Sequence, residues 1–319
     1  MSAARTQPET TDPETGWTEV PVFVHGILPE ADPASHAKEY NALLDAVNAA
    51  LRRYGKRPFS SHRIYVEWGW DSRQSTQPDR YLAEVERKIA MHTNRAVKKT
   101  RDFTLNPLRL AYKPMRSLFF FGVADLFYYV SEDGETAVRT HVFDYVAGKI
   151  REMMRSPKTR LSLTFFGHSA GSLISHDLLF HLFGKKDAAK SEGPAMARDL
   201  NPVRGFIRHD RLRIRHLYTF GSPISTLALR SNSMIDKIRH STLLQPRDIG
   251  LRASDRLPAP RWVNFWDQDD LFSGPVSFLY ANRDGVIEDK YLNVGSFFPA
   301  THTTYWYSAE MADHIAKTF

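Results

Sequence analysis

The sequence predicts an α/β protein, with a mostly parallel central sheet and helices on both of its faces. Short β-branched and aromatic runs alternate with amphipathic helical patterns along the chain, and this alternation is typical of parallel strands joined by helices. The 319 residues include 42% apolar and 25% charged side chains, which is the usual composition of a globular protein. We therefore expect a single domain over 19–319, preceded by a flexible tail at 1–18 that lacks periodicity.

The first expected strand covers 20–24, a continuous apolar run that ends at His25-Gly26. A helix is expected from Asp32-Pro33, because aspartate is a good N-cap and proline suits the first turn. Its apolar residues recur at every third or fourth position until Gly55 ends the pattern, which indicates one buried face. A second strand is expected at 63–68.

A long insertion over 71–135 follows the second strand, and we interpret it as a helical cap. It far exceeds the usual connection of about 2–6 residues. Nine Lys and Arg against one acid give 87–116 a net charge of +8, and an apolar, aromatic run follows at 118–130. This composition is typical of elements that contact anionic lipid surfaces. The alternative is that the aromatic residues pack the cap onto the core while the basic residues face water.

The second half of the chain continues the alternation of helices and strands. In order, we expect a helix over 138–153, a strand at 161–166, a helix over 173–183, a surface loop at 184–203, and strands at 214–220, 262–266 and 291–294. No internal repeat divides this series, which supports one domain with an inserted cap over two independent domains.

The strongest motif is Gly167-His168-Ser169-Ala170-Gly171, which lies between an expected strand and an expected helix. A G-x-S-x-G pattern in this strand–turn–helix context is typical of a nucleophile elbow. The two glycines allow a tight turn that lifts the serine hydroxyl above the sheet, and the helix N-terminus favours developing negative charge. We therefore predict that Ser169 is a nucleophile. We interpret His168, inside the motif, as a packed structural histidine and not as a second base.

With these features, the sequence resembles the α/β-hydrolase superfamily, and within it the lipases and esterases. The resemblance covers about 20–316 and consists of four features in order along the chain. They are His25-Gly26 after the first strand, the elbow, an acidic turn after a late strand and a histidine after the last strand. The insertion lies outside the resemblance. What it implies is an α/β-hydrolase fold, a catalytic triad and no cofactor, and our interpretation of the insertion adds a helical cap to this fold.

A serine nucleophile needs a base, and the base needs an orienting acid; the superfamily places them in the order Ser, acid, His. Three aspartates, Asp267, Asp269 and Asp270, follow a late strand. The resemblance favours Asp270, which precedes a hydrophobic residue, with Asp267 as the second choice and Asp269 as the third. Of the two histidines after this turn, His302 lies where the family places its base, and we expect His314 to be a surface histidine.

The oxyanion hole is expected to use two backbone N–H groups. One belongs to Ala170, the residue after the nucleophile. By resemblance, the other belongs to Ile27, since Gly26 allows the backbone before it to approach the substrate. The alternative for His25-Gly26 is a simple turn that ends the strand.

Together these residues predict a serine hydrolase that cleaves carboxylic esters, with lipid esters as one class, through an acyl-enzyme intermediate. Two alternatives stay open. The first is a serine hydrolase of another specificity, such as a peptidase, a thioesterase or an acyltransferase. The second is a non-catalytic relative that uses its basic surface to bind a partner.

Composition excludes several other kinds of site and several other classes of protein. The absence of cysteine excludes a thiol nucleophile, a disulfide scaffold and thiolate metal sites, and the 13 histidines show no metal-binding spacing. The net charge of +7 comes with no nucleic-acid-binding motif, so we expect no nucleic-acid partner. No run reaches the ~18 apolar residues of a membrane span and the first residues are polar. We therefore expect a cytoplasmic protein with a small-molecule or lipid ester as its substrate.

Overall fold

The computed structural model contains one sheet of six parallel strands and seven α-helices, counted over the residues that it describes. Those residues are 16–26, 33–68, 132–184, 193–228, 236, 238, 240, 243–251, 261–282, 284–295 and 300–319. The strands follow the order β2-β1-β3-β4-β5-β6 across the sheet. The predicted α/β architecture with a parallel sheet is therefore confirmed.

The strands lie close to the predicted positions, and every neighbouring pair is parallel. Their bounds are β1 (Thr18–Val24), β2 (Ile64–Val66), β3 (Leu161–His168), β4 (Leu212–Phe220), β5 (Arg261–Trp266) and β6 (Ile287–Tyr291). All eight residues of β3 are buried, as expected for a strand covered by helices on both faces.

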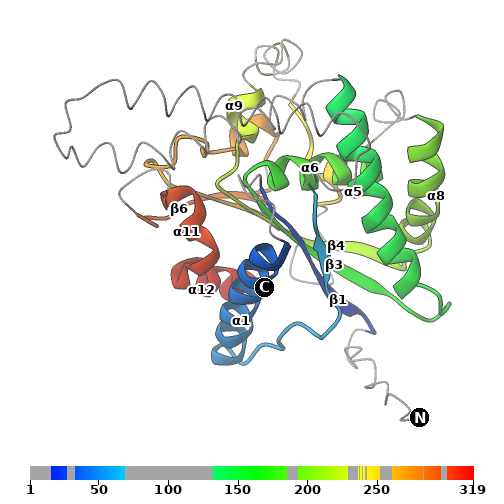
Figure 1. The fold of residues 1–319 in the computed structure, drawn as a ribbon, viewed down its shortest axis with the longest axis horizontal. Coiled ribbons are helices and arrows are strands. Elements are labelled where there is room, and N and C mark those ends of the chain that lie inside the picture. The colour runs from blue at the N-terminus through cyan, green and yellow to red at the C-terminus, as the bar shows by residue number, and fades with distance from the viewer. Residues whose placement is uncertain are drawn as a thin grey trace, which may run out of the picture.

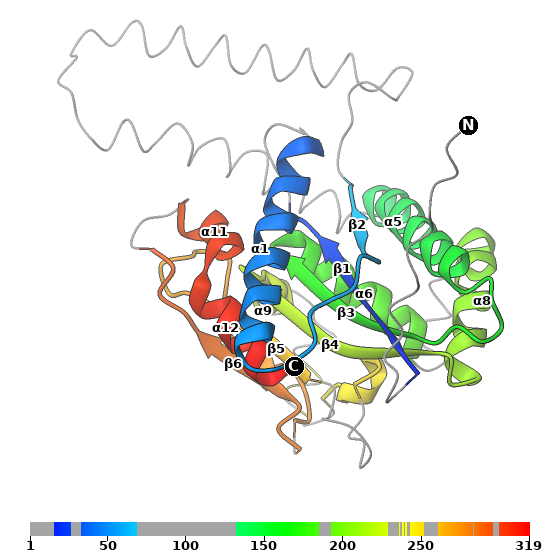
Figure 2. The same ribbon diagram turned by 90° about the horizontal axis from the view of Figure 1, so that it is seen from below.

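The helices cover both faces of the sheet. The α-helices are α1 (Pro33–Arg53), α5 (Glu132–Met153), α6 (Ala170–Phe183), α8 (Pro194–Arg208), α9 (Ile224–Ala228), α11 (Ala300–Thr304) and α12 (Ala309–Thr318). Short 3-10 helices are η2 (Pro246–Ile249), η3 (Ser277–Leu279) and η4 (Tyr305–Tyr307). Figures 1 and 2 both place α1 and α12 on one side of the sheet, and α5, α6 and α8 on the other.

Each face of the sheet has its own hydrophobic cluster. Phe165 of β3 belongs to the cluster that packs against α5, α6 and α8, whereas its neighbour Phe166 belongs to the cluster that packs against α1 and α12. This division follows from strand geometry, because successive side chains point to opposite faces. Two buried layers hold the strands firmly, so the loops that follow them are placed on a rigid base.

Three sequence predictions need correction. The surface loop expected at 184–203 contains most of α8, whose buried residues Met196, Leu200 and Val203 recur at helical spacing among polar neighbours. The last strand is β6 at Ile287–Tyr291 and not 291–294; its polar interior residues hid its pairing with β5. The tail predicted at 1–18 is too long, because Trp17 is buried and β1 starts at Thr18.

The cap predicted at 71–135 lies outside the described residues, except that 132–135 form the start of α5. Its contact with anionic lipid therefore stays a prediction. Among the helices that the structure describes, none has the length and apolar character needed to cross a membrane.

Candidate active site

The site lies at the carboxyl-terminal edge of the sheet, at the point where the strand order changes direction. β1 leads outward to β2, whereas β3 lies on the other side of β1. In open parallel sheets, such a switch point leaves a crevice for ligands beyond the strand ends. Val24, the last residue of β1, pairs with Gly167 of β3, and His168 pairs with Phe220 of β4. The residues that follow these three strands therefore meet at one place.

Ser169 occupies the tight turn between β3 and α6 in a strained backbone conformation. Its φ is 51° and its ψ is −127°, and a residue with a side chain pays about 1–3 kcal/mol for such a conformation. Ser169 is partly exposed, whereas His168 and Ala170 on either side of it are buried. The turn therefore directs the hydroxyl away from the core, as the motif predicts.

Three glycines make room for this turn. A Cβ on Gly167 would lie 2.7 Å from the Cα of Ser172, and a Cβ on Gly171 would collide with the backbone of β1. Gly26, which follows β1, packs so closely on Ser169 that a Cβ there would collide with the serine side chain. Since these clashes involve backbone atoms or the serine Cβ, rotating a side chain cannot relieve them.

The end of β4 and the residues after it hold the strained turn in place. The N–H of Ser169 donates to the carbonyl of Phe220 at 3.0 Å. The hydroxyl of Ser172 donates to the carbonyl of Ser169 at 2.5 Å, and its oxygen lies 2.7 Å from the hydroxyl oxygen of Ser222. The backbone of Ser169 is therefore fixed on both its N–H and its carbonyl side.

His302, in α11, lies between Ser169 and a carboxylate. Its Nε2 is 2.9 Å from the Oγ of Ser169, and its Nδ1 is 2.9 and 3.0 Å from the two carboxylate oxygens of Asp270. Because a carboxylate only accepts, Nδ1 carries the proton, and the lone pair of Nε2 faces the serine hydroxyl. His302 and Asp270 are each 2% exposed, so water is kept away from their contact.

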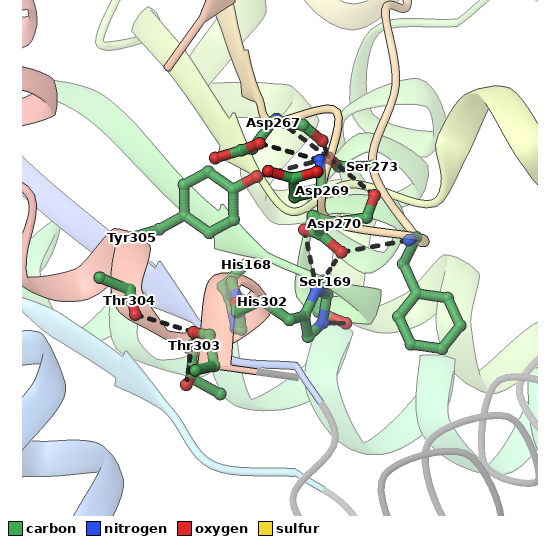
Figure 3. Close-up of polar contacts among 12 residues, drawn as sticks. His168, Ser169, Asp267, Asp269, Asp270, Ser273, His302, Thr303, Thr304 and Tyr305 are labelled. Carbon is green, nitrogen blue, oxygen red and sulfur yellow. Dashed lines mark hydrogen bonds and ion pairs between the residues drawn. The ribbon is translucent and has the colours of Figure 1, made fainter. Parts of the chain in front are cut away.

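Asp270 is the carboxylate that contacts His302, as Figure 3 shows. Burial raises the pKa of Asp270, but the hydrogen bond and charge of His302 and the N–H of Phe272 outweigh burial, so the pKa lies below its usual value. Asp270 is therefore charged at neutral pH and can stabilise a positive charge on the imidazole.

The other two aspartates of the turn have different surroundings. Asp267 is fully buried, and its carboxylate accepts the N–H of Asp269 at 2.9 Å and the N–H of Val294 at 2.7 Å. It thereby joins the end of β5 to the segment after β6. Asp269 is exposed. The second and third choices for the acid thus lie in positions suited to forming the turn.

The structure places one of the two predicted oxyanion donors. Ala170 is buried at the start of α6, directly after Ser169. Among the hydrogen bonds that join described residues, none uses its N–H. Ile27 lies outside the described residues, and the oxyanion-hole roles of Ala170 and Ile27 both stay predictions.

His25 fixes the end of β1 against the end of β2. Its Nδ1 contacts the carbonyl of Gly26, and its Nε2 accepts the N–H of Trp68 at 3.2 Å. Its carbonyl accepts the indole N–H of Trp68 at 2.7 Å, and its ring stacks on His36 with 3.5 Å between centroids. Burial lowers the pKa of His25 well below its usual value, so this contact uses a neutral imidazole.

Sequence reasoning did not assign a role to Gly221 and Ser222, which follow β4. Gly221 has a φ of 60°, and a Cβ there would lie 3.2 Å from both the Asp270 carboxylate and the ring of His302. The signal was visible in the sequence, because Gly221-Ser222-Pro223 follows a strand that ends at the same edge as the elbow.

In the described residues, no group of three or more His, Cys, Asp or Glu side chains is placed to bind a metal ion. The absence of a cofactor stays a prediction.

No family model and no curated protein matches this chain. Among solved structures, one match is the crystal structure of an uncharacterized protein from Pseudomonas aeruginosa. It has 11% sequence identity and a TM-score of 0.31, and the match covers 94% of this chain and 46% of that one. This chain therefore spans about half the length of that protein. A likeness at this level identifies neither a fold family nor a function.

Proposed function

We propose that this chain is a serine hydrolase of the α/β-hydrolase superfamily, of the lipase or esterase type, and that it cleaves carboxylic esters. The observation that carries the proposal is the series of contacts from Ser169 Oγ through His302 to the Asp270 carboxylate, at 2.9 Å on the serine side and 2.9 and 3.0 Å on the acid side. The strand–turn–helix setting of Ser169 and the order Ser, Asp, His along the chain support the superfamily assignment.

In the acylation step, the Oγ of Ser169 attacks the ester carbonyl carbon while the Nε2 of His302 takes the hydroxyl proton. The carbonyl electrons move onto oxygen, and the N–H of Ala170 stabilises the resulting oxyanion together with a second donor from the loop after β1. His302 then gives its proton to the leaving alcohol oxygen as the C–O bond breaks. Asp270 stabilises the transient imidazolium.

In the deacylation step, the same groups act on a water molecule. His302 takes a proton from the water as its oxygen attacks the acyl carbon, and it returns the proton to the Oγ of Ser169 as the acyl bond breaks. The products are a carboxylic acid and the original serine. No redox partner or cofactor enters either step.

Two alternative assignments differ in how well they fit the same contacts. A peptidase, a thioesterase or an acyltransferase would use the same three residues, and its substrate pocket alone would distinguish it. A non-catalytic binding protein would not need Ser169 in a strained conformation with its hydroxyl 2.9 Å from a buried histidine.

A fluorophosphonate probe, which reacts covalently with activated serines, tests the proposal. We expect the wild-type protein to be labelled and Ser169→Ala to be unlabelled, with a loss of at least about a thousand-fold in ester hydrolysis. The matched control is Ser175→Ala, one turn along α6, whose hydroxyl donates to the carbonyl of Gly171; it should be labelled. An unlabelled wild-type protein, or equal labelling of Ser169→Ala, would contradict the proposal.

Esters of graded acyl length, compared with matched thioester and peptide substrates, then establish the substrate class. Preference for the ester series supports an esterase or lipase. Preference for the thioester or the peptide would assign one of the other specificities without changing the role of Ser169.

A further inference from the structure

The ring of His168 lies next to the ring of His302, tilted by 42° to it. His168 is the residue before the nucleophile, at the end of β3, and it is 5% exposed. Its ring centroid is 4.9 Å from that of His302, 5.3 Å from that of Phe220 and 5.3 Å from that of Trp306. Aromatic rings from β4 and η4 therefore fix the orientation of His168.

His168 makes a polar contact with the backbone that carries His302. Its Nε2 is 2.6 Å from the carbonyl oxygen of His302. Because a carbonyl oxygen only accepts, Nε2 must carry a proton and donate it. α11 has only five residues, and Trp306, four positions after His302, lies outside it. The contact with His168 therefore ties the backbone of this short helix to the end of β3.

We propose that His168 is a positioning residue, which holds the backbone of His302 in the position from which its imidazole contacts both Ser169 and Asp270. The proposal rests on the proposed function of these three residues. It assigns the histidine of the elbow a task in the reaction without contact with the substrate. Two adjacent residues of the elbow then contact His302: Ser169 contacts its side chain, and His168 contacts its backbone carbonyl.

The surroundings of His168 keep its imidazole neutral. Burial, and then the nearby His302, lower the pKa of His168 to about 3, against opposing effects of its hydrogen bond to the His302 carbonyl and of Asp270. The titratable groups that face it are His302 of α11, Asp270 after β5, His36 of α1, His25 after β1 and Tyr305 of η4. A neutral donor can hold His302 without repelling the positive charge that the imidazole acquires during the reaction.

Paired substitutions separate the hydrogen bond from the packing. In His168→Leu, which removes the donor, we expect kcat for a short ester to fall at least tenfold with little change in KM. The acid limb of the profile of kcat/KM against pH should move to lower pH, since a looser contact with Asp270 favours the imidazolium less. In His168→Gln, whose amide can donate to the same carbonyl, most of kcat should return.

The matched control is His216→Leu. His216 is also a buried histidine next to Tyr218, but it lies in the middle of β4, and its Nδ1 accepts the N–H of Arg261. We expect this variant to lose thermal stability with no change in kcat or in the pH profile. An unchanged pH profile in folded His168→Leu, or a His168→Gln variant as impaired as His168→Leu, would overturn the proposal.

A spectroscopic measurement on the wild-type protein keeps the test independent of activity and of variant folding. Nitrogen-15 NMR of the histidine rings should show His168 with its proton on Nε2 and neutral down to about pH 4. Finding the proton on Nδ1, or an imidazolium near neutral pH, would overturn the proposal. If the tautomer is as expected but no serine probe labels the protein, the proposed function fails and the positioning contact stands.

Discussion

The two edges of the sheet are built in opposite ways. At the carboxyl-terminal edge, the contacts converge on one residue, His302, whose side chain contacts Ser169 and Asp270 and whose backbone carbonyl contacts His168. At the amino-terminal edge, the contacts run between strands. Trp17 lies between the guanidinium groups of Arg160 and Arg213, each 4.1 Å from its ring.

Ion pairs also connect neighbouring strands at the amino-terminal edge. Arg160 contacts Asp210 at 2.5 Å, and Arg213 contacts Glu19 at 3.7 Å. These pairs connect β1, β3 and β4 near the first residues of the strands. Ser169 lies at the opposite edge of the sheet, directly after the last residue of β3. A change at the amino-terminal edge should therefore lower stability and spare the reaction, whereas a change in a side chain that contacts His302 at the carboxyl-terminal edge should lower kcat.

The largest effect should come from the two aspartates of the acidic turn. Asp270→Asn should lower kcat by about a thousand-fold or more, because an amide supports neither the tautomer nor the positive charge of His302. Asp267→Asn should leave kcat within about tenfold but lower the free energy of unfolding by about 1–3 kcal/mol, because an amide has a single acceptor oxygen, so one of the two N–H groups that Asp267 accepts loses its partner. Ester kinetics and urea unfolding measure both. Equal losses of kcat would show that the turn acts as one unit.

The next effect concerns Trp17, at the opposite edge. Trp17→Ala should cost about 3 kcal/mol or more in unfolding free energy, because a large buried ring is lost. The kcat of the folded fraction should not change. Arg160→Gln is the control, and its cost should stay below about 1 kcal/mol because its partner Asp210 is exposed. A large fall in kcat for Trp17→Ala would mean that the two edges are coupled.

A smaller effect is expected for Gly221→Ala, which we compare with Gly285→Ala. The two glycines have φ values of 60° and 61°, so both variants force a side chain into the left-handed region. Only at Gly221 would the new methyl meet Asp270 and His302, at 3.2 Å; at Gly285 it would meet nothing within 4 Å. We expect a loss in kcat of about tenfold for Gly221→Ala, since small misplacements of reacting groups are costly, and none for Gly285→Ala. If both variants keep full activity, the site tolerates a shift of the His–Asp pair.

The smallest effect is the pH dependence of stability. Burial lowers the pKa of His168 to about 3 and that of His216 well below its usual value. In the unfolded chain both would titrate near about 6.5. Below that pH the unfolded state binds more protons, so stability is lost as the pH falls.

Each of these histidines should add up to about 1.4 kcal/mol per pH unit to the slope. Urea unfolding between pH 7.5 and 5 should show a shallower slope for His168→Gln and for His216→Gln alike, although only the first variant touches the site. A slope that neither substitution changes would mean that these imidazoles do not titrate on unfolding.

Much of the site could be predicted because strand ends at one edge of a parallel sheet must meet. That rule predicts that Ser169 and the acidic turn lie close together, because each directly follows a strand of the sheet. The same rule applied to the end of β4 would have included Gly221. The choice among three aspartates within four residues could not come from composition. It depends on which carboxylate the turn directs toward His302, and hydrogen bonds across the fold, such as Val294 to Asp267, decide that direction.

The elements that sequence patterns missed have weak local signals. α8 buries Met196, Leu200 and Val203 among polar residues, so its apolar face is narrow. The sequence pattern of β6 does not predict a buried strand, because Glu288, Asp289 and Lys290 occupy its centre. In the fold, the carboxylate of Asp289 accepts three hydrogen bonds, from Asn264, Val276 and Ser277. Tertiary contacts stabilise both elements, and such contacts leave little trace in a single sequence.

The distance along the chain between Ser169 and His302, 133 residues, also bears on the order of folding. Contacts between residues so far apart form late, because closing a long loop costs entropy before the contact returns any free energy. A chain that has formed β1, β3 and the elbow but has not docked α11 contains the nucleophile without its base. We expect reactivity toward the fluorophosphonate probe to return after far-ultraviolet circular dichroism during refolding. Ser169 would then not react with the probe until the last third of the chain, which carries His302, has folded.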